Sequence, residues 1–85
     1  MMRDEVTWFA NKMEAKLAAN DWKGGWRDMG TADLLARIDE EVMELCAAFL
    51  ETRGSRVDPR EDTISECVDV ANFCMMLADV LSRLE

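Results

Sequence analysis

The chain has 85 residues, of which 49% are hydrophobic and 33% charged, with 18 acidic side chains against 10 basic ones and a formal net charge of −8. The composition fits one compact helical domain and excludes a disordered chain, while the negative charge disfavours general binding to nucleic acid. A single chain of this length buries only about 60 to 65% of the surface that its unfolded state exposes, so we expect oligomerisation.

Cysteine and histidine content excludes several kinds of site. The three cysteines, Cys46, Cys67 and Cys74, lie in helical patterns without a CxxC spacing, so we expect reduced core residues rather than zinc ligands or disulfides. The chain has no histidine. This absence removes the Glu-x-x-His motif of di-iron bundles and any mechanism that depends on a histidine base.

The sequence shows no segment for export or membrane insertion. The first residues place acids where a signal peptide needs an uninterrupted apolar core, and the longest uncharged stretch, residues 70–78, is too short to span a bilayer. We therefore expect a cytoplasmic protein without a membrane partner.

The first half of the chain predicts a helix followed by an ordered loop. Apolar residues at helical spacing predict a helix over residues 3–19 that ends near Asn20, with Lys12, Glu14 and Lys16 largely outside the apolar face. Residues 20–30 break this periodicity with three glycines and contain two of the three tryptophans, which indicates a loop.

The second half predicts two antiparallel helices. Thr31 or Asp33 is expected to cap a helix that runs to about Thr52. Its apolar stripe consists of Leu34, Leu35, Ile38, Val42, Leu45 and Phe49. A turn is expected over residues 54–60, and the acids of residues 61–66 suit the start of a third helix that reaches about Arg83.

The third helix is apolar nearly all round, so we expect it to contact neighbours on more than one side. A partner chain is expected to supply the second contact. The predicted fold class is thus all-α: three main helices per chain, in an antiparallel bundle completed by oligomerisation. Residues 1–85 form a single domain.

Two pairs of acids stand out, Glu41 with Glu44 and Glu66 with Asp69. Residues three apart lie on one helix face, and the second pair continues an apolar row that consists of Phe73, Leu77, Val80 and Leu84. Ionised groups in such a seam cost several kcal/mol unless something compensates them. A divalent metal is the simplest compensation, and four carboxylates without histidine suit Mg²⁺.

The positions of the acids around the second helix predict different degrees of burial. Glu41 falls at the edge of the apolar stripe and is expected to be half-buried, whereas Glu44 and then Glu40 lie further round. Asp39, Glu51, Asp58 and Glu61 are expected to be ordinary surface acids.

Glu40-Glu41-x-x-Glu44, then 21 residues, then Glu66-x-x-Asp69 resembles the signature of the MazG-like, all-α nucleoside triphosphate pyrophosphohydrolases. The loop 20–26 (NDWKGGW) and residues 66–76 (ECVDVANFCMM) look like a short, phage-type subgroup, which includes dGTP/dATP diphosphohydrolases resembling MazZ. The similarity covers most of the chain. It implies a bacterial or phage-infected host cytoplasm as the setting.

The resemblance implies hydrolysis between the α and β phosphates, which yields a nucleoside monophosphate and pyrophosphate. It also implies two or three Mg²⁺ or Mn²⁺ ions in each site and a homodimer or a dimer of dimers. By position, the metal ligands would be Glu41, Glu44, Glu66 and Asp69, with Glu40 in an outer shell or holding an additional ion. Glu41 or Glu44 would also orient or deprotonate the attacking water, and the sequence leaves both open.

The loop and its flanks would bind substrate. Lys16 and Lys23 could reach phosphate oxygens, and Asn72, one turn past Asp69, would face the same cavity and touch the substrate. Asn20 and Asp21 either cap the first helix and shape the loop or read a base edge, including that of guanine. Of Trp22 and Trp26, we expect one to pack in the core, and one could stack on a purine.

Two other functions stay open at this point. The same helices could form a noncatalytic adaptor, in which the acids bind a basic partner and no metal is needed. A phosphoribosyl-ATP pyrophosphohydrolase of the same helical superfamily is the closer enzymatic alternative, although the tryptophan-bearing loop favours the MazG-like branch. The sequence leaves base and sugar preference undecided.

Overall fold

The computed structural model of the protein describes residues 1–51 and 59–84. In chain order it contains α1 (Asp4–Ala19), a short 3₁₀ helix η1 (Asp21–Lys23), α2 (Thr31–Glu51) and α3 (Pro59–Ser82). These described residues contain no strand, so the predicted all-α class is confirmed. Across the same ranges, none of the helices has the length and apolar character needed to cross a membrane.

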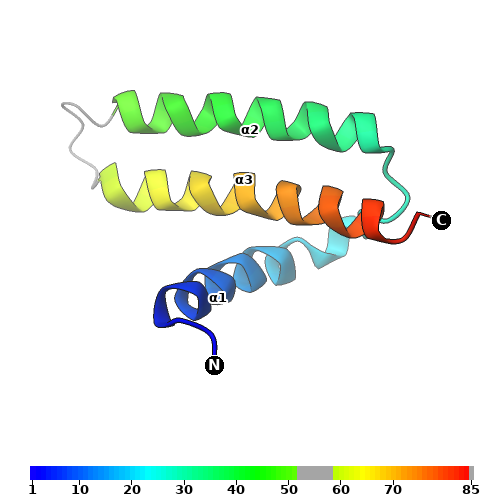
Figure 1. The fold of residues 1–85 in the computed structure, drawn as a ribbon. Coiled ribbons are helices and arrows are strands. Elements are labelled where there is room, and N and C mark those ends of the chain that lie inside the picture. Colours follow the sequence, from blue (N-terminus) through cyan, green and yellow to red (C-terminus); the bar gives the residue numbers. More distant parts are fainter. Residues whose placement is uncertain (52–58, 85) are drawn as a thin grey trace.

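α3 is the central element of the fold. It runs antiparallel to α2, which lies along one side of it, and it also contacts α1 (Figure 1). The prediction that the third helix has neighbours on more than one side is therefore confirmed. Within the chain its second neighbour is α1, because the loop after α1 lets this helix fold back onto α3.

The end of α1 lies where the sequence predicts it. Nδ2 of Asn20 donates a hydrogen bond to the backbone oxygen of Lys16 at 2.9 Å, which satisfies one of the carbonyls left over at a helix C-terminus. Gly24, in the following loop, has a φ of +90°, a conformation that glycine adopts without a steric penalty.

Two predicted helix starts need correction. The backbone N–H of Leu34 donates to the oxygen of Gly30 at 3.0 Å, so Gly30 precedes the first turn of α2 and neither Thr31 nor Asp33 holds the cap position. α3 already begins at Pro59, within the predicted turn, because proline has no N–H and fits the first position of a helix. The rest of that turn, residues 54–58, and the helix end at Thr52 lie outside the described residues.

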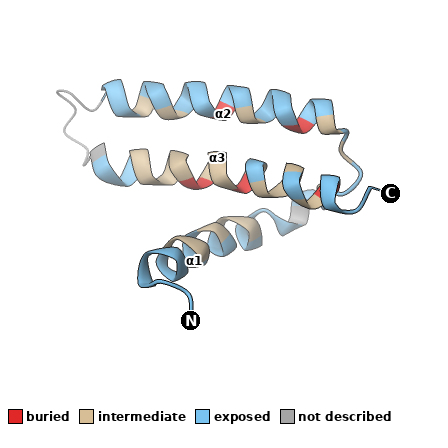
Figure 2. Cartoon of the chain, viewed as in Figure 1, coloured by how far each residue is buried: buried red, intermediate tan, exposed pale blue. Residues whose placement is uncertain are grey.

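The core of the single chain is small. Among the described residues, the buried apolar side chains are Leu34, Val68 and Val80 (Figure 2). The predicted apolar stripe of α2 divides into a row that faces α3, with Leu34 fully buried, and an outer row in which Leu35 and Phe49 are 60% and 57% exposed. The stripe is wider than one neighbouring helix can cover.

Two further expectations of burial are wrong for the single chain. Cys46 and Cys74 are exposed and Cys67 is partly buried, although all three thiols are free as predicted. Leu84, the expected end of the apolar row on α3, is 62% exposed, because α3 ends at Ser82 and the chain leaves the interface there.

Replacement of a core leucine should cost far more stability than replacement of an exposed one. We expect Leu34→Ala, at 0% exposure, to lower the free energy of unfolding by about 2 to 5 kcal/mol. Leu81→Ala, at 51% exposure, is the control and should cost less than about 1 kcal/mol. Urea unfolding followed by circular dichroism measures both, and equal losses would contradict the described packing.

Candidate metal and phosphate site

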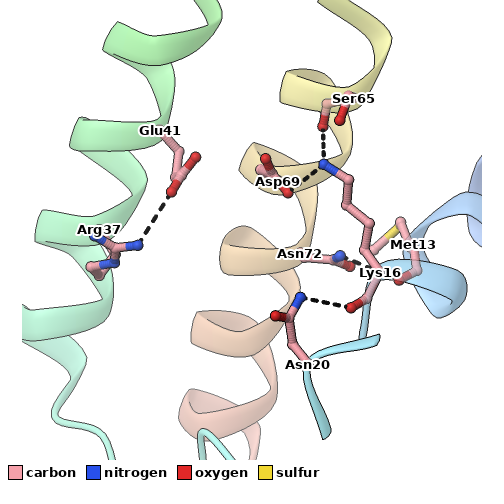
Figure 3. Close-up of polar contacts among 8 residues, drawn as sticks. All are labelled: Met13, Lys16, Asn20, Arg37, Glu41, Ser65, Asp69 and Asn72. Atoms are coloured by element: carbon pink, nitrogen blue, oxygen red, sulfur yellow. Dashed lines mark hydrogen bonds and ion pairs between the residues drawn. The ribbon is translucent and has the colours of Figure 1, made fainter. Parts of the chain in front are cut away.

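Three of the four predicted ligand acids converge where α2 faces α3. One carboxylate oxygen each of Glu41, Glu66 and Asp69 lies within 4.8 Å of the other two. Glu66 and Asp69 share a face of α3 because they are three residues apart. Glu41 extends from α2 toward that face (Figure 3). We refer to these three residues as the carboxylate triad.

The triad is only partly compensated within the described part of the chain. Glu41 is 6% exposed, and its Oε2 atom is buried without a hydrogen-bond partner there, as is Oε2 of Glu66. A buried carboxylate oxygen without a donor is energetically costly. Two such atoms at one place indicate a site that is complete only when a cation or a proton is present.

The pKa values of Glu41 and Glu66 also show that ionisation of these two carboxyls is unfavourable. Burial, followed by the neighbouring carboxyl of Glu44 and the charge of Asp69, raises the pKa of Glu41 from 4.5 to about 7, although Arg37 acts in the opposite direction. Burial and then the charge of Asp69 also raise the pKa of Glu66. Protonation is thus one way in which the chain relieves the repulsion among these acids.

Two basic side chains from different helices also reach the triad. Nζ of Lys16, on α1, donates to Oδ1 of Asp69 at 2.8 Å and to the backbone oxygen of Ser65 at 2.9 Å (Figure 3). Lys16 was expected largely outside the apolar face, and it instead reaches across to α3. On α2, Nη2 of Arg37 lies 3.3 Å from Oε1 of Glu41.

The remaining predicted acids lie further from the triad. Glu44 is exposed, but it borders the same cavity and acts on the pKa of Glu41. Glu40 is exposed and pairs with Nη1 of Arg37. Glu41 is the most buried of the three acids on α2, as the helical wheel predicts, and it is more deeply buried than expected. The surface acids Asp39, Glu51 and Glu61 are exposed as predicted, while Asp58 lies outside the described residues.

A cavity of about 420 Å³ opens beside the triad, between α1, the loop, α2 and α3. Its lining includes five residues that the sequence predicts to bind substrate: Lys16, Asn20, Lys23, Trp26 and Asn72. Asp21 is exposed on η1 and is not part of this lining. The structure therefore brings most of the predicted substrate residues to one space, next to the predicted metal ligands.

Asn72 makes a hydrogen bond within the helical bundle and also lines the cavity. It is 5% exposed, and its Nδ2 atom donates to the backbone oxygen of Met13 on α1 at 3.3 Å. This bond fixes the orientation of the amide, because the reversed amide would set two oxygens against each other. Oδ1 is then buried without a partner in the described residues and can accept a hydrogen bond from a ligand.

The loop that forms one wall of the cavity is bonded to the C-terminal part of α3. Nε1 of Trp26 donates to Oδ2 of Asp79 at 3.0 Å, and this hydrogen bond, aided by Arg83, holds the pKa of Asp79 below its usual range. Trp26 is half-buried, so it packs and borders the cavity at once. The side chain of Trp22 lies outside the part that the structure describes.

The residues of the triad fit a hard divalent cation. All of their donor atoms are carboxylate oxygens, the ligands that Mg²⁺ and Mn²⁺ prefer, and two of the triad's oxygens have no hydrogen-bond partner in the described part of the chain. Glu44 is near enough to affect the charge of the group. Glu41, Glu66 and Asp69 would hold such an ion, with Glu44 beside them.

Sequence reasoning missed Arg37 and Asp79. The pairing of Arg37 with Glu41 follows the i, i+4 spacing of an ordinary surface ion pair. This spacing predicts the pair itself, but it does not show whether the pair lies at a cavity or on the open surface. The partner of Asp79 lies 53 residues away in the chain, and no local pattern reports such a contact.

Comparisons with known proteins do not place the chain in a family. No protein-family model matches it, and neither a curated protein nor a solved structure does. The functional conclusion therefore depends on the residues of the site and on the resemblance of the acidic motifs.

Removal of the buried charge should stabilise the metal-free protein. Because the folded-state pKa of Glu41 is about 7 rather than 4.5, the stability that its protonated form contributes is lost as pH rises through this range. We expect Glu41→Gln to be about 3 kcal/mol more stable than the natural protein at pH 8, since one pKa unit corresponds to about 1.4 kcal/mol. The difference should shrink toward pH 5.

Urea unfolding at the two pH values measures this effect in the presence of a chelator. Glu40→Gln, an exposed neighbour, is the control and should change the free energy of unfolding by less than about 0.5 kcal/mol. Destabilisation of Glu41→Gln at pH 8 would show that the charge of Glu41 is well compensated in the fold.

Proposed function

We propose that the protein is a metal-dependent (deoxy)nucleoside triphosphate pyrophosphohydrolase that cleaves between the α and β phosphates. The observation that carries this proposal is the carboxylate triad of Glu41, Glu66 and Asp69, with two buried and unpartnered oxygens, beside a cavity. The resemblance of its motifs to MazG-like enzymes supports the same function. The proposed setting is the cytoplasm of a bacterium or of a phage-infected host.

The charges around the cavity support a phosphorylated substrate. Three basic residues, Lys16, Lys23 and Arg37, share the cavity lining with Glu41, Glu44 and Asp69. A chain with a net charge of −8 repels a polyphosphate unless bound cations and local basic groups reverse the potential. A cavity volume of about 420 Å³ is within the usual range for small-molecule sites, about 300 to 1,000 Å³.

The chain itself contributes binding, orientation and proton handling to the proposed reaction. Bound Mg²⁺ or Mn²⁺, two or three per site by resemblance, would supply charge neutralisation and a more acidic water. Glu44 helps to raise the pKa of Glu41 to about 7, so Glu41 can hold a proton near neutral pH. In the proposal one of these two glutamates accepts the proton of the attacking water, so no protein nucleophile is needed.

The loop supplies the proposed base-recognition groups. Asn20 and Trp26 border the cavity, where an amide can read a base edge and an indole can pack against a purine. Asn72 lines the same cavity, and its Oδ1 atom has no hydrogen-bond partner among the described residues. In this proposal Asp21, which is exposed on η1, reads a base edge together with Asn20. A preference for purine deoxynucleotides such as dGTP or dATP is part of this proposal.

A noncatalytic adaptor remains the second candidate, because exposed apolar side chains on α2 could bind another protein. That function gives no reason for unpartnered carboxylate oxygens inside the chain. Phosphoribosyl-ATP pyrophosphohydrolase activity would use the same triad and differs in substrate. A substrate panel distinguishes the two enzymatic candidates, and metal titration distinguishes either of them from the adaptor.

Incubation with Mg²⁺ and a panel of nucleotides should release a nucleoside monophosphate and pyrophosphate. Asp69→Asn and Glu66→Gln should lower kcat/KM at least about 100-fold, because each removes a charged ligand, while the helical circular dichroism spectrum is retained. Glu61→Gln, an exposed acid of the same helix, is the control. Release of single phosphate would contradict the assigned bond.

We also propose that the protein acts as a homodimer or a dimer of dimers. Leu35, Val42 and Phe49 are exposed and follow a seven-residue spacing on the outer face of α2, which is the pattern by which helices pair along a seam. A second copy of the same chain offers the matching row. This contact would also bury apolar surface that the small core of the single chain leaves exposed.

Light scattering after gel filtration should therefore give at least twice the mass of 9.7 kDa. Val42→Glu should shift the protein toward the monomer, because it places a charge in the proposed seam. Ala47→Glu is the matched control, since residue 47 is exposed and lies about 140° round the helix from residue 42. A monomeric natural protein would refute this assembly.

A further inference from the structure

Arg37 lies at the border between the carboxylate triad and the open cavity. It comes one helical turn before Glu41 on α2 and lines the cavity. Its Nη2 atom lies 3.3 Å from Oε1 of Glu41, and its Nη1 atom pairs with Oε2 of Glu40. The side chain is 45% exposed, so a ligand in the cavity can reach it.

The position of Arg37 does not depend on Glu41 alone. Its Cζ atom lies 5.0 Å from the centroid of the Phe73 ring, on α3, which is within the range of a cation–π contact. The ring and the carboxylate of Glu40 therefore both contact the guanidinium. A guanidinium has five N–H donors in a rigid fork, and the pairs with the two glutamates leave donors for a further acceptor.

Arg37 and Lys16 approach the triad from opposite helices. Lys16 binds Asp69 from α1, while Arg37 binds Glu41 from α2 (Figure 3). An arginine that shares Glu41 with a divalent cation is held less strongly by that carboxylate, because the cation draws on the same negative charge. Its remaining attachments to Phe73 and Glu40 keep it at the cavity wall.

We propose that Arg37 is a substrate-binding residue that donates hydrogen bonds to the phosphate groups of the nucleotide. The inference rests on the proposed function and adds to it a residue outside the acidic motifs. A planar fork of donors matches phosphate oxygens better than a lysine does. Because Phe73 and Glu40 already orient the guanidinium, little conformational entropy is lost when the phosphate binds.

Calorimetric titration of Arg37→Ala tests this role in two stages. Mn²⁺ alone should bind with unchanged or slightly higher affinity, since the three carboxylates of the triad remain and a competing cation is gone. With Mn²⁺ present, a purine deoxynucleoside triphosphate with a nonhydrolysable α–β bridge should bind about 10- to 100-fold more weakly. The nucleotide affinity of Arg37→Lys should fall between those of the natural protein and of Arg37→Ala, because lysine keeps the positive charge but lacks the planar fork of donors.

Arg3→Ala is the matched control, because it removes one positive charge from an exposed position before α1 and outside the cavity lining. Unchanged triphosphate affinity in Arg37→Ala would overturn the proposal, as would an equal loss in Arg3→Ala. Loss of Mn²⁺ affinity would also overturn it, since Arg37 would then act by positioning Glu41. Failure of the natural protein to bind Mn²⁺ and nucleotide would refute the proposed function and this inference together.

Discussion

The repulsion among three carboxylates at the contact between α2 and α3 is the constraint on which the rest of this structure depends. Two helices that pack along their length normally place apolar atoms at the contact. Here Glu41 takes a position in the row that faces α3, directly opposite Glu66 and Asp69. The fold must therefore compensate negative charge where other helix pairs gain hydrophobic stabilisation.

The chain compensates this charge in three partial ways. Lys16 reaches across from α1 to Asp69, Arg37 pairs with Glu41 along α2, and the raised pKa of Glu41 favours a bound proton near neutral pH. None of them supplies a donor to the two unpartnered glutamate oxygens of the described structure. A site with this incomplete compensation is stabilised by any divalent cation that binds it, since binding to the folded state alone adds to stability.

The helices pack around a small core. α3 packs against α1 on one side and α2 on the other, and the space beside the triad remains open as a cavity. The hydrogen bond between Trp26 and Asp79 ties the loop to α3, so the cavity wall is held by a polar contact rather than by a large apolar core. Leu35 and Phe49, in the outer row of α2, are 60% and 57% exposed in the single chain.

The sequence by itself determined where the helices lie along the chain and which acids share a helix face. Periodicity and helix-ending residues are local signals, so the bounds of α1, the end of α3 and the deeper burial of Glu41 than of Glu40 and Glu44 could be read from the chain. Only the tertiary structure decided which side chains meet: Lys16 with Asp69, Trp26 with Asp79, and Arg37 with Phe73. It also decided which half of the α2 stripe is buried, because burial depends on the width of a neighbouring helix and on where the loop returns the chain, and neither is encoded in local spacing.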